Sequence, residues 1–227
     1  IHITGLFSCG GVHSHIRHII KLIEILLAET TKNIFLHMIT DGRDRPIDAF
    51  SSDNQKLIAL TKTNSERIKV ASIAGRYFAM DRDRNWERTE CASESIISSE
   101  HFDFDQWLEQ HIQSGISDEF VKPISLNASQ ITPTDTFIAC NFRADRMAQL
   151  ISHLENKFPA KYLIFGDYPL TKDALNIFPK QTIEDTLGSV VSEAGLNQLR
   201  ITETEKFADV TYFFNALNQK PLANETR

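Results

Sequence analysis

The sequence predicts an α/β fold in which a mostly parallel sheet carries helices on both faces. Runs with the pattern of strands alternate with runs of helical periodicity, and such alternation is typical of parallel sheets with crossover helices. The chain has 227 residues, of which 41% are hydrophobic. It can therefore bury a full core, and wholesale disorder is excluded.

The expected elements follow one another in a regular order. Ile16, Ile19, Ile20 and Ile23 recur at helical spacing after the first strand-like run. Strands are expected at residues 1–7, 34–39, 68–73, 136–140 and 162–165, with an extended segment at 121–126. Helices are expected at residues 14–27, 49–61, 86–99, 105–113, 147–154 and 186–194.

A shift in composition near Pro179 predicts a boundary, with one domain over residues 1–180 and a shorter segment over 181–227. The chain begins with Ile1 inside a strand-like run, from which we expect it to be a piece of a longer polypeptide. Its three widely spaced cysteines form no disulfide framework. They indicate a reducing compartment, the cytoplasm.

The charge balance excludes some classes of partner. The chain has 24 Lys and Arg against 30 Asp and Glu, a net charge of −6. This argues against a nucleic-acid partner, because such binding depends on positive charge. The most apolar stretch, residues 16–28, is interrupted by Arg17, Lys21 and Glu24, so no membrane-spanning helix is expected.

Arginines gather in the loops that follow the predicted strands. In open α/β sheets, ligands bind beyond the carboxyl ends of the strands. Eight of the twelve arginines lie in or just after these loops, namely residues 43, 45, 76, 82, 84, 88, 143 and 146. The guanidinium fork suits carboxylate and phosphate. The set predicts a site for a small, multiply charged anion, although single arginines could instead form ion pairs with Asp81, Asp83 or Asp145.

Asp44 is the candidate general acid/base. It follows Arg43 in a glycine-containing turn at a strand end, where a carboxylate can relay a proton to or from a substrate hydroxyl. The alternative is an aspartate that serves the turn or caps the next helix.

His13, His15 and His18 suggest a metal site as a competing hypothesis. Their spacing is similar to the His-x-His-x-Asp-His pattern of binuclear metallohydrolases, but the acidic position is occupied here by Arg17. Gly10 and Gly11 are the only glycine pair at a strand–helix junction that could hold a phosphate.

Six segments together make the chain similar to the cofactor-independent phosphoglycerate mutases. They are FSCGGVHSH (7–15), DGRD (41–44), GRYFAMDRD (75–83), DEFV (118–121), NFRADR (141–146) and QLRITETEK (198–206). This family has a phosphatase-like domain, related to alkaline phosphatase, and an α/β transferase domain inserted into it. The resemblance implies that residues 1–180 are the transferase domain, and that 181–227 are a return segment into the alkaline-phosphatase-like α/β domain.

The resemblance also implies a reaction and a set of residues. The reaction interconverts 3-phosphoglycerate and 2-phosphoglycerate through a phosphoserine and bound glycerate. Asp44 would relay the hydroxyl proton, and Lys206 would approach the transferring phosphoryl group. The implied substrate-binding set is His13, Arg43, Asp44, Arg76, Arg82, Arg143, Arg146 and Lys206. The serine and the ligands of two Mn²⁺ or Mg²⁺ ions would lie outside this chain, which would itself hold no metal, and the full-length protein would be a monomer.

The chain differs from the family pattern at several positions. Cys9 stands where the family has aspartate, Asn85 where it has arginine, and Asp209 where it has a histidine in the strand expected after Lys206. Ala216 and Leu217 replace a pair of glycines. The leading hypothesis is thus a glycolytic mutase of which this chain is the substrate-holding part. The alternative hypothesis is a diverged anion-binding α/β module without catalysis.

Overall fold

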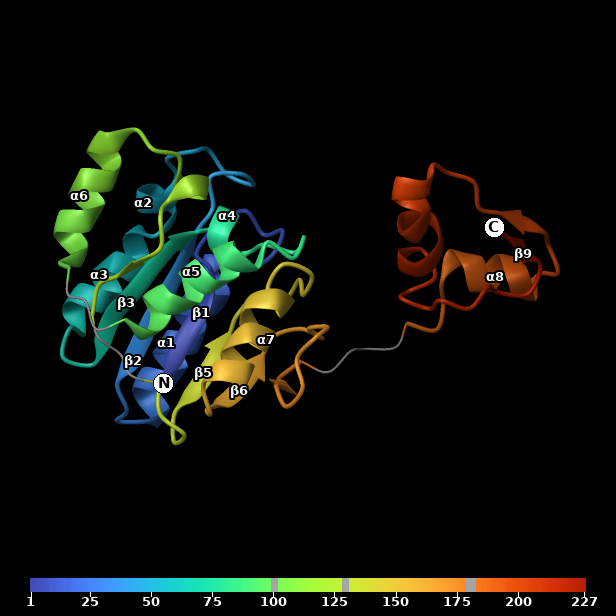
Figure 1. Cartoon of the computed structure of the whole chain (residues 1–227). Coiled ribbons are helices and arrows are strands. Elements are labelled where there is room, and N and C mark those ends of the chain that lie inside the picture. The colour runs from blue at the N-terminus through green and yellow to red at the C-terminus, as the bar shows by residue number, and fades with distance from the viewer. Residues whose placement is uncertain (99–101, 128–130, 179–182) are drawn as a thin grey trace. The chain divides into compact units, whose positions relative to one another are not determined.

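The computed structural model describes residues 1–98, 102–127, 131–178 and 183–227. The chain divides into two compact units, Ile1–Pro179 and Lys180–Arg227 (Figure 1). Within the described residues, no helix has the length and apolar character needed to cross a membrane.

The first unit is built on a sheet that confirms the α/β prediction. Within the described residues the sheet has seven strands in the order β4-β3-β2-β1-β5-β6-β7, and β4 alone pairs antiparallel. The strands are β1 (His2–Leu6), β2 (Ile34–Thr40), β3 (Ile68–Gly75), β4 (Ile124–Ser125), β5 (Thr136–Ala139), β6 (Lys161–Ile164) and β7 (Leu175–Asn176).

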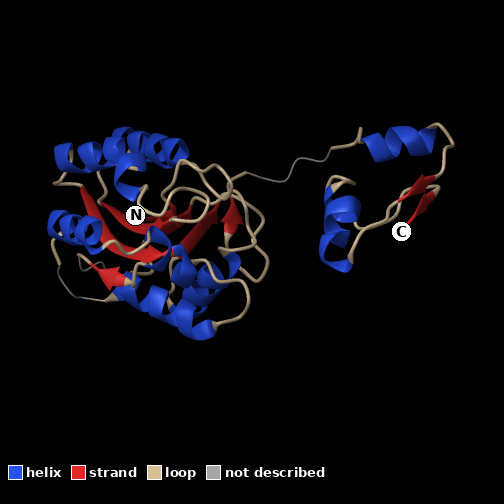
Figure 2. Cartoon of the chain, turned by 90° about the horizontal axis from the view of Figure 1, so that it is seen from above, coloured by secondary structure: helices blue, strands red, loops and turns tan. Residues whose placement is uncertain are grey.

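Helices cover both faces of this sheet (Figure 2). One buried cluster joins Ile3 of β1 to helices α1 (Ile16–Glu29), α2 (Phe50–Asp53), α3 (Gln55–Thr63) and α6 (Phe104–Ser114). A second cluster joins Leu6 to helices α4 (Arg76–Ala79), α5 (Trp86–Ile97) and α7 (Ala148–Lys157). Side chains alternate along a strand, so Ile3 and Leu6 face opposite layers.

Strand order reverses at β1. The chain proceeds from β1 to β2 and β3 on one side, and β5 then pairs with β1 on the other, with Ile3 opposite both Leu36 and Ile138. Loops that leave the carboxyl ends of β1 and β5 therefore diverge and open a crevice, which is where doubly wound sheets bind ligands.

Most expected elements are present, with two instructive differences. The helix expected at 49–61 is interrupted at Asn54, whose side-chain amide donates to the Phe7 carbonyl at 2.8 Å and to the Phe50 carbonyl at 2.9 Å. The short helix α4 directly after β3 was not predicted, because four residues show no periodicity. The last residue of the helix expected at 86–99 lies outside the described residues.

The second unit contains α8 (Leu187–Glu193), β8 (Gln198–Leu199), the 3₁₀ helix η2 (Thr204–Lys206), the π-helix η3 (Asp209–Phe213) and β9 (Glu225–Thr226). Thr186 and Ser189 form a capping box at the start of α8. The strand expected after Lys206 was wrong, since Asp209–Phe213 is a π-helix.

Candidate functional site

Arg76 is the buried centre of a charged cluster at the carboxyl edge of the sheet. It opens α4 directly after β3, and its side chain is 3% exposed. Its Nη1 donates to Asp41 Oδ1 at 2.7 Å and to Asp44 Oδ2 at 2.6 Å. Its Nη2 lies 3.1 Å from His13 Nε2. Loops after β1, β2 and β3 thus meet on one guanidinium.

The contact with Arg76 fixes the state of His13. A guanidinium can only donate, so His13 Nε2 accepts and the neutral ring carries its proton on Nδ1. Burial, together with the charges of Arg76 and Arg143, lowers the pKa of His13 to about 4. The buried Nδ1 atom has no hydrogen-bond partner among the residues that the structure describes, and it lies 3.9 Å from Asp145 Oδ1. The site therefore contains an unused, neutral N–H donor.

Asp145 forms ion pairs with two arginines on the other side of the crevice. It follows β5 and accepts from Arg82 Nη1 at 2.7 Å and from Arg143 Nε and Nη2 at 3.0 and 3.1 Å. Burial alone would raise the pKa of Asp145, but these two guanidinium groups hold it below its ordinary value. The Arg143 backbone N–H donates to the His13 carbonyl at 3.2 Å, which joins the loops after β1 and β5.

Arg146 and Arg43 complete the cluster. Burial, followed by the nearby charges of Arg82, Arg43 and Arg76, lowers the pKa of the Arg146 guanidinium, which nevertheless stays protonated. Within the described part of the chain, no ion pair joins Arg146 to a carboxylate. Its Nη1 donates instead to the Met80 carbonyl at 3.3 Å. Arg146 thus keeps guanidinium donors and a positive charge with which it could bind an anion.

The structure places the predicted residues as follows. It brings together seven of the eight, namely His13, Arg43, Asp44, Arg76, Arg82, Arg143 and Arg146. Lys206 belongs to the second unit, where it ends η2 with an exposed side chain. Asp44 pairs with Arg76 and makes no cap for α2, which begins without a side-chain cap bond.

Three carboxylates of the site were not among the predicted binding residues: Asp145, which the sequence suggested only as an ion-pair partner of the arginines, Asp41 and Glu119. Asp41 accepts from Ser8 Oγ at 2.6 Å and from the Asp44 backbone at 3.0 Å, besides Arg76. Burial would raise the pKa of Asp41, but these hydrogen bonds lower it. Glu119 Oε1 lies 3.7 Å from Arg43 Nη1. Asp41 directly follows β2, so the signal that singled out Asp44 could have found it. Glu119 follows no strand and gave no such signal.

The histidine metal hypothesis finds no support in the described residues, which contain no group of three or more His, Cys, Asp and Glu able to hold a metal ion. His13 faces Arg76, whereas His15 caps α1 by accepting from the Arg17 backbone. His18 packs against Phe142 with ring centroids 6.0 Å apart.

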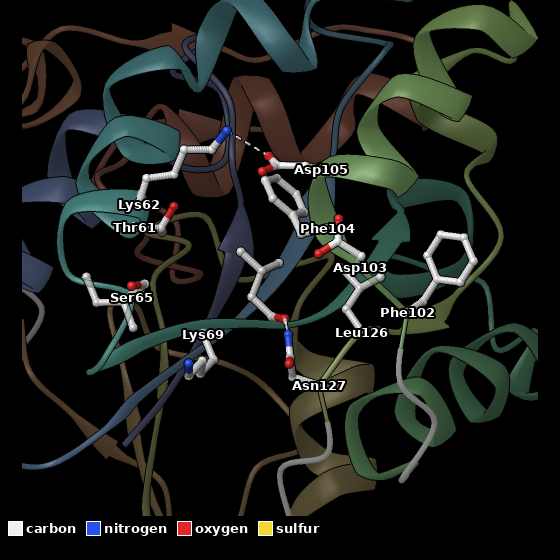
Figure 3. Close-up of a pocket in the computed structure, with 12 residues that line it drawn as sticks. Thr61, Lys62, Ser65, Lys69, Phe102, Asp103, Phe104, Asp105, Leu126 and Asn127 are labelled. Atoms are coloured by element: carbon white, nitrogen blue, oxygen red, sulfur yellow. Dashed lines mark hydrogen bonds and ion pairs between the residues drawn. The ribbon is translucent and has the colours of Figure 1, made fainter.

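A separate cavity of about 390 Å³ lies at the opposite end of β3 (Figure 3). It is bounded by Ile68 and Val70 at the start of that strand, and by residues of α3 and α6. Lys62 Nζ and Asp105 Oδ1 form an ion pair across it at 2.9 Å (Figure 3). Its lining carries two lysines and two aspartates, so it lacks the surplus of cations found around Arg146.

The fold and the cluster define a doubly wound α/β unit with a cationic site at the switch point of its sheet. Residues 1–176 match the family model described as "BPG-independent PGAM N-terminus". The chain belongs to the BPG-independent phosphoglycerate mutase family, which confirms the resemblance seen in the motifs.

Individual relatives agree with this assignment. The chain is 39% identical over 241 residues to the 2,3-bisphosphoglycerate-independent phosphoglycerate mutase of Wolinella succinogenes, and 38% identical over 247 residues to such a mutase of Methanosarcina barkeri. Each match covers 100% of this chain and 48% of the relative. A crystal structure of Leishmania mexicana phosphoglycerate mutase at low cobalt concentration matches with a TM-score of 0.73 and 26% identity, over 99% of this chain and 46% of that one. The chain thus spans about half the length of these relatives.

Proposed function

We propose that the protein to which this chain belongs is an isomerase that interconverts 3-phosphoglycerate and 2-phosphoglycerate through a phosphoserine intermediate. In this proposal the unit Ile1–Pro179 holds glycerate and phosphoglycerate. The carrying observation is the convergence of five guanidinium groups and one neutral histidine donor at the carboxyl edge of the sheet. The family membership and the names of the relatives support the same reaction.

The geometry suggests how the groups divide the task. Arg146, Arg82 and Arg143 would bind carboxylate and phosphate oxygens, since each presents planar N–H donors to the crevice. His13 Nδ1–H would donate to a glycerate oxygen. Asp44, one-fifth exposed and held by Arg76 at 2.6 Å, would relay the hydroxyl proton of glycerate. Lys206 is proposed to approach the transferring phosphoryl group.

The remaining parts of the proposal concern residues outside this chain. The serine nucleophile and the ligands of two Mn²⁺ or Mg²⁺ ions are proposed to lie there, where the ions would activate the serine and stabilise phosphoryl charge. A role in glycolysis, a cytoplasmic location and a monomeric full-length protein belong to the same proposal.

Substitution of two residues tests the proposal in a full-length version of the protein. Arg143→Ala should weaken 3-phosphoglycerate binding by about 10- to 100-fold, because each charge-assisted hydrogen bond contributes about 1.5–3 kcal/mol. Asp44→Asn should lower kcat more than it raises KM, since the amide cannot take up a proton. Steady-state kinetics and calorimetric binding measure both effects.

Lys62→Ala is the matched control, because it removes a cation outside the cluster and should leave both constants unchanged. Unaltered turnover in both site variants would contradict the proposal. An inactive full-length parent that still binds phosphoglycerate would support the anion-binding module instead. Turnover by the 227-residue chain without added protein would also contradict the assignment of the nucleophile to residues outside it.

A further inference from the structure

Asp118 lies behind the charged cluster, in the 3₁₀ helix η1 (Asp118–Phe120), and its side chain is 2% exposed. It contacts none of the seven clustered residues directly through its carboxylate. Instead, it holds the segment of the chain that carries two of them. Within the described residues, this buried carboxylate forms no ion pair with a lysine or an arginine. Its role must therefore come from the hydrogen bonds that it makes.

Three hydrogen bonds attach Asp118 to the segment at residues 40–50. The Thr40 hydroxyl donates to the Asp118 carbonyl at 2.6 Å, and the Asp118 N–H donates to the Ile47 carbonyl at 2.7 Å. The Phe50 N–H donates to Asp118 Oδ2 at 2.8 Å. Residues 40, 47 and 50 bracket the turn that contains Arg43 and Asp44, so Asp118 fixes that turn at both of its ends.

A histidine of α6 contacts the other carboxylate oxygen of Asp118. His111 Nε2 lies 2.7 Å from Asp118 Oδ1. The His111 ring stacks on Trp107 with centroids 5.1 Å apart and planes inclined by 6°, and Trp107 packs edge-on against Phe50. The imidazole is therefore locked by the core, and it orients the carboxylate toward the turn.

The backbone around η1 also leaves the turn no room to shift. A Cβ atom on Gly42, which has φ +68°, would lie 2.5 Å from the Glu119 nitrogen, and one on Gly75 would lie 2.3 Å from the Glu119 oxygen. The Gly75 N–H donates to the Val121 carbonyl at 2.8 Å. The helix η1 is thus wedged between the carboxyl ends of β2 and β3, which deliver Asp44 and Arg76.

We propose that Asp118, oriented by His111, is a positioning residue that sets Arg43 and Asp44 against Arg76 in the candidate site. The proposal rests on the proposed function for its kinetic readout. Asp118 acts through the turn and touches no substrate. Its loss should displace Arg43 and Asp44 together and leave the loop after β5, with Arg143, in place.

The test is a double-mutant cycle in the full-length protein. His111→Phe keeps a ring on Trp107 and removes the donor to Asp118, and Asp118→Asn keeps an acceptor for Phe50 while placing an amide against His111. Each should lower kcat/KM by about 10- to 100-fold, because small misplacement of a catalytic group has effects of that size. Added to Arg43→Ala, His111→Phe should cause a smaller loss than in the parent, since only Asp44 is left for it to displace.

Arg143→Ala is the matched control for the cycle. In this background His111→Phe should lower kcat/KM by the same factor as in the parent. Hydrogen exchange gives a second readout that needs no activity. In His111→Phe the amides of residues 42–48 should exchange faster, while those of 141–146 keep their protection. The positioning role would be overturned if His111→Phe lowered kcat/KM by the same factor in Arg43→Ala as in Arg143→Ala. It would also be overturned if hydrogen exchange rose equally in residues 42–48 and 141–146. If the wild-type protein neither binds nor converts phosphoglycerate, the proposed function fails, whereas the exchange comparison still decides the role of Asp118.

Discussion

At the scale of single residues, His13 shows how a site can fix a protonation state. The guanidinium of Arg76 occupies Nε2, and burial keeps the ring neutral. A second histidine, His2, behaves similarly deep in the sheet, where its Nδ1 lies 3.0 Å from His37 Nε2 and burial lowers its pKa to about 4. Both rings therefore resist protonation as long as the chain is folded.

These two histidines predict acid sensitivity. Between pH 6.5 and 4 the unfolded chain binds protons at both imidazoles and the folded chain does not, so the free energy of unfolding falls as the pH falls through this window. Each group contributes at most about 3 kcal/mol to the loss at pH 4, and nothing above pH 6.5. Urea unfolding at pH 4.5, 5.5 and 7 should show this slope, and His13→Gln should make it shallower. An NMR titration of His13 with a midpoint near 6.5 would contradict the prediction.

Single residues also show what the sequence could and could not predict. Arg76 and Asp44 could be predicted because they follow strand ends, where open α/β sheets bind ligands. This prediction needs only the order of elements along the chain. The Arg82–Asp145 ion pair joins residues 63 positions apart, so the sequence could offer Asp145 only as one of three possible partners, and the fold selects it. The contacts of Asp118 with Thr40 and His111 are invisible in the sequence, because they depend on η1, which carries no periodic pattern.

At the scale of elements, the strong periodic helices were predictable and the short connecting elements were not. Helix α1 has Ile16, Ile19 and Ile23 on one buried face, so its pattern alone locates it. The break at Asn54 arises from a hydrogen bond to Phe7, 47 residues away. The π-helix η3 was missed because an apolar run such as 210–215 suits a strand equally well.

The end of η3 contains strained backbone. Ala216 and Leu217 have φ of 51° and 67°, in the left-handed region that disfavours side chains. Their N–H groups donate to the carbonyls of Phe213 and Tyr212 at 3.2 and 2.8 Å, which closes the turn. The turn thus has a backbone geometry typical of glycine.

Glycine at either position should therefore stabilise the second unit. Ala216→Gly is expected to raise its free energy of unfolding by about 1 kcal/mol, because it removes the left-handed strain. Slower hydrogen exchange in residues 209–217 would report the gain. Gly195→Ala provides the reverse control, since Gly195 has φ +72° with open space around it and should lose a similar amount. An Ala216→Gly variant that exchanges faster than the parent would refute the strain argument.

At the scale of the whole molecule, the candidate site is built by residues of one unit. All seven clustered residues lie in Ile1–Pro179. The second unit has many large apolar side chains at the surface, among them Ile201, which is 81% exposed, and Leu187, which is 67% exposed. The chain also spans about half the length of the relatives that it matches.

A chain that ends at Pro179 should consequently keep the anion site. We expect it to bind 3-phosphoglycerate within about threefold of the 227-residue chain, a difference below 1 kcal/mol. Calorimetry on the two proteins measures this directly. A loss of tenfold or more on truncation, with the sheet still folded by circular dichroism, would show that residues beyond Pro179 contribute to binding.

The close approach of Gly42 and Gly75 to the Glu119 backbone has a consequence for how this site can change during evolution or engineering. The ends of β2 and β3 are interlocked with η1, so none of the three can be lengthened or reshaped alone. A new ligand preference would have to come from exchanging the charged side chains that this rigid frame presents. Libraries that randomise Arg43, Arg82 or Arg146 should therefore yield folded variants far more often than libraries of loop insertions at the same place.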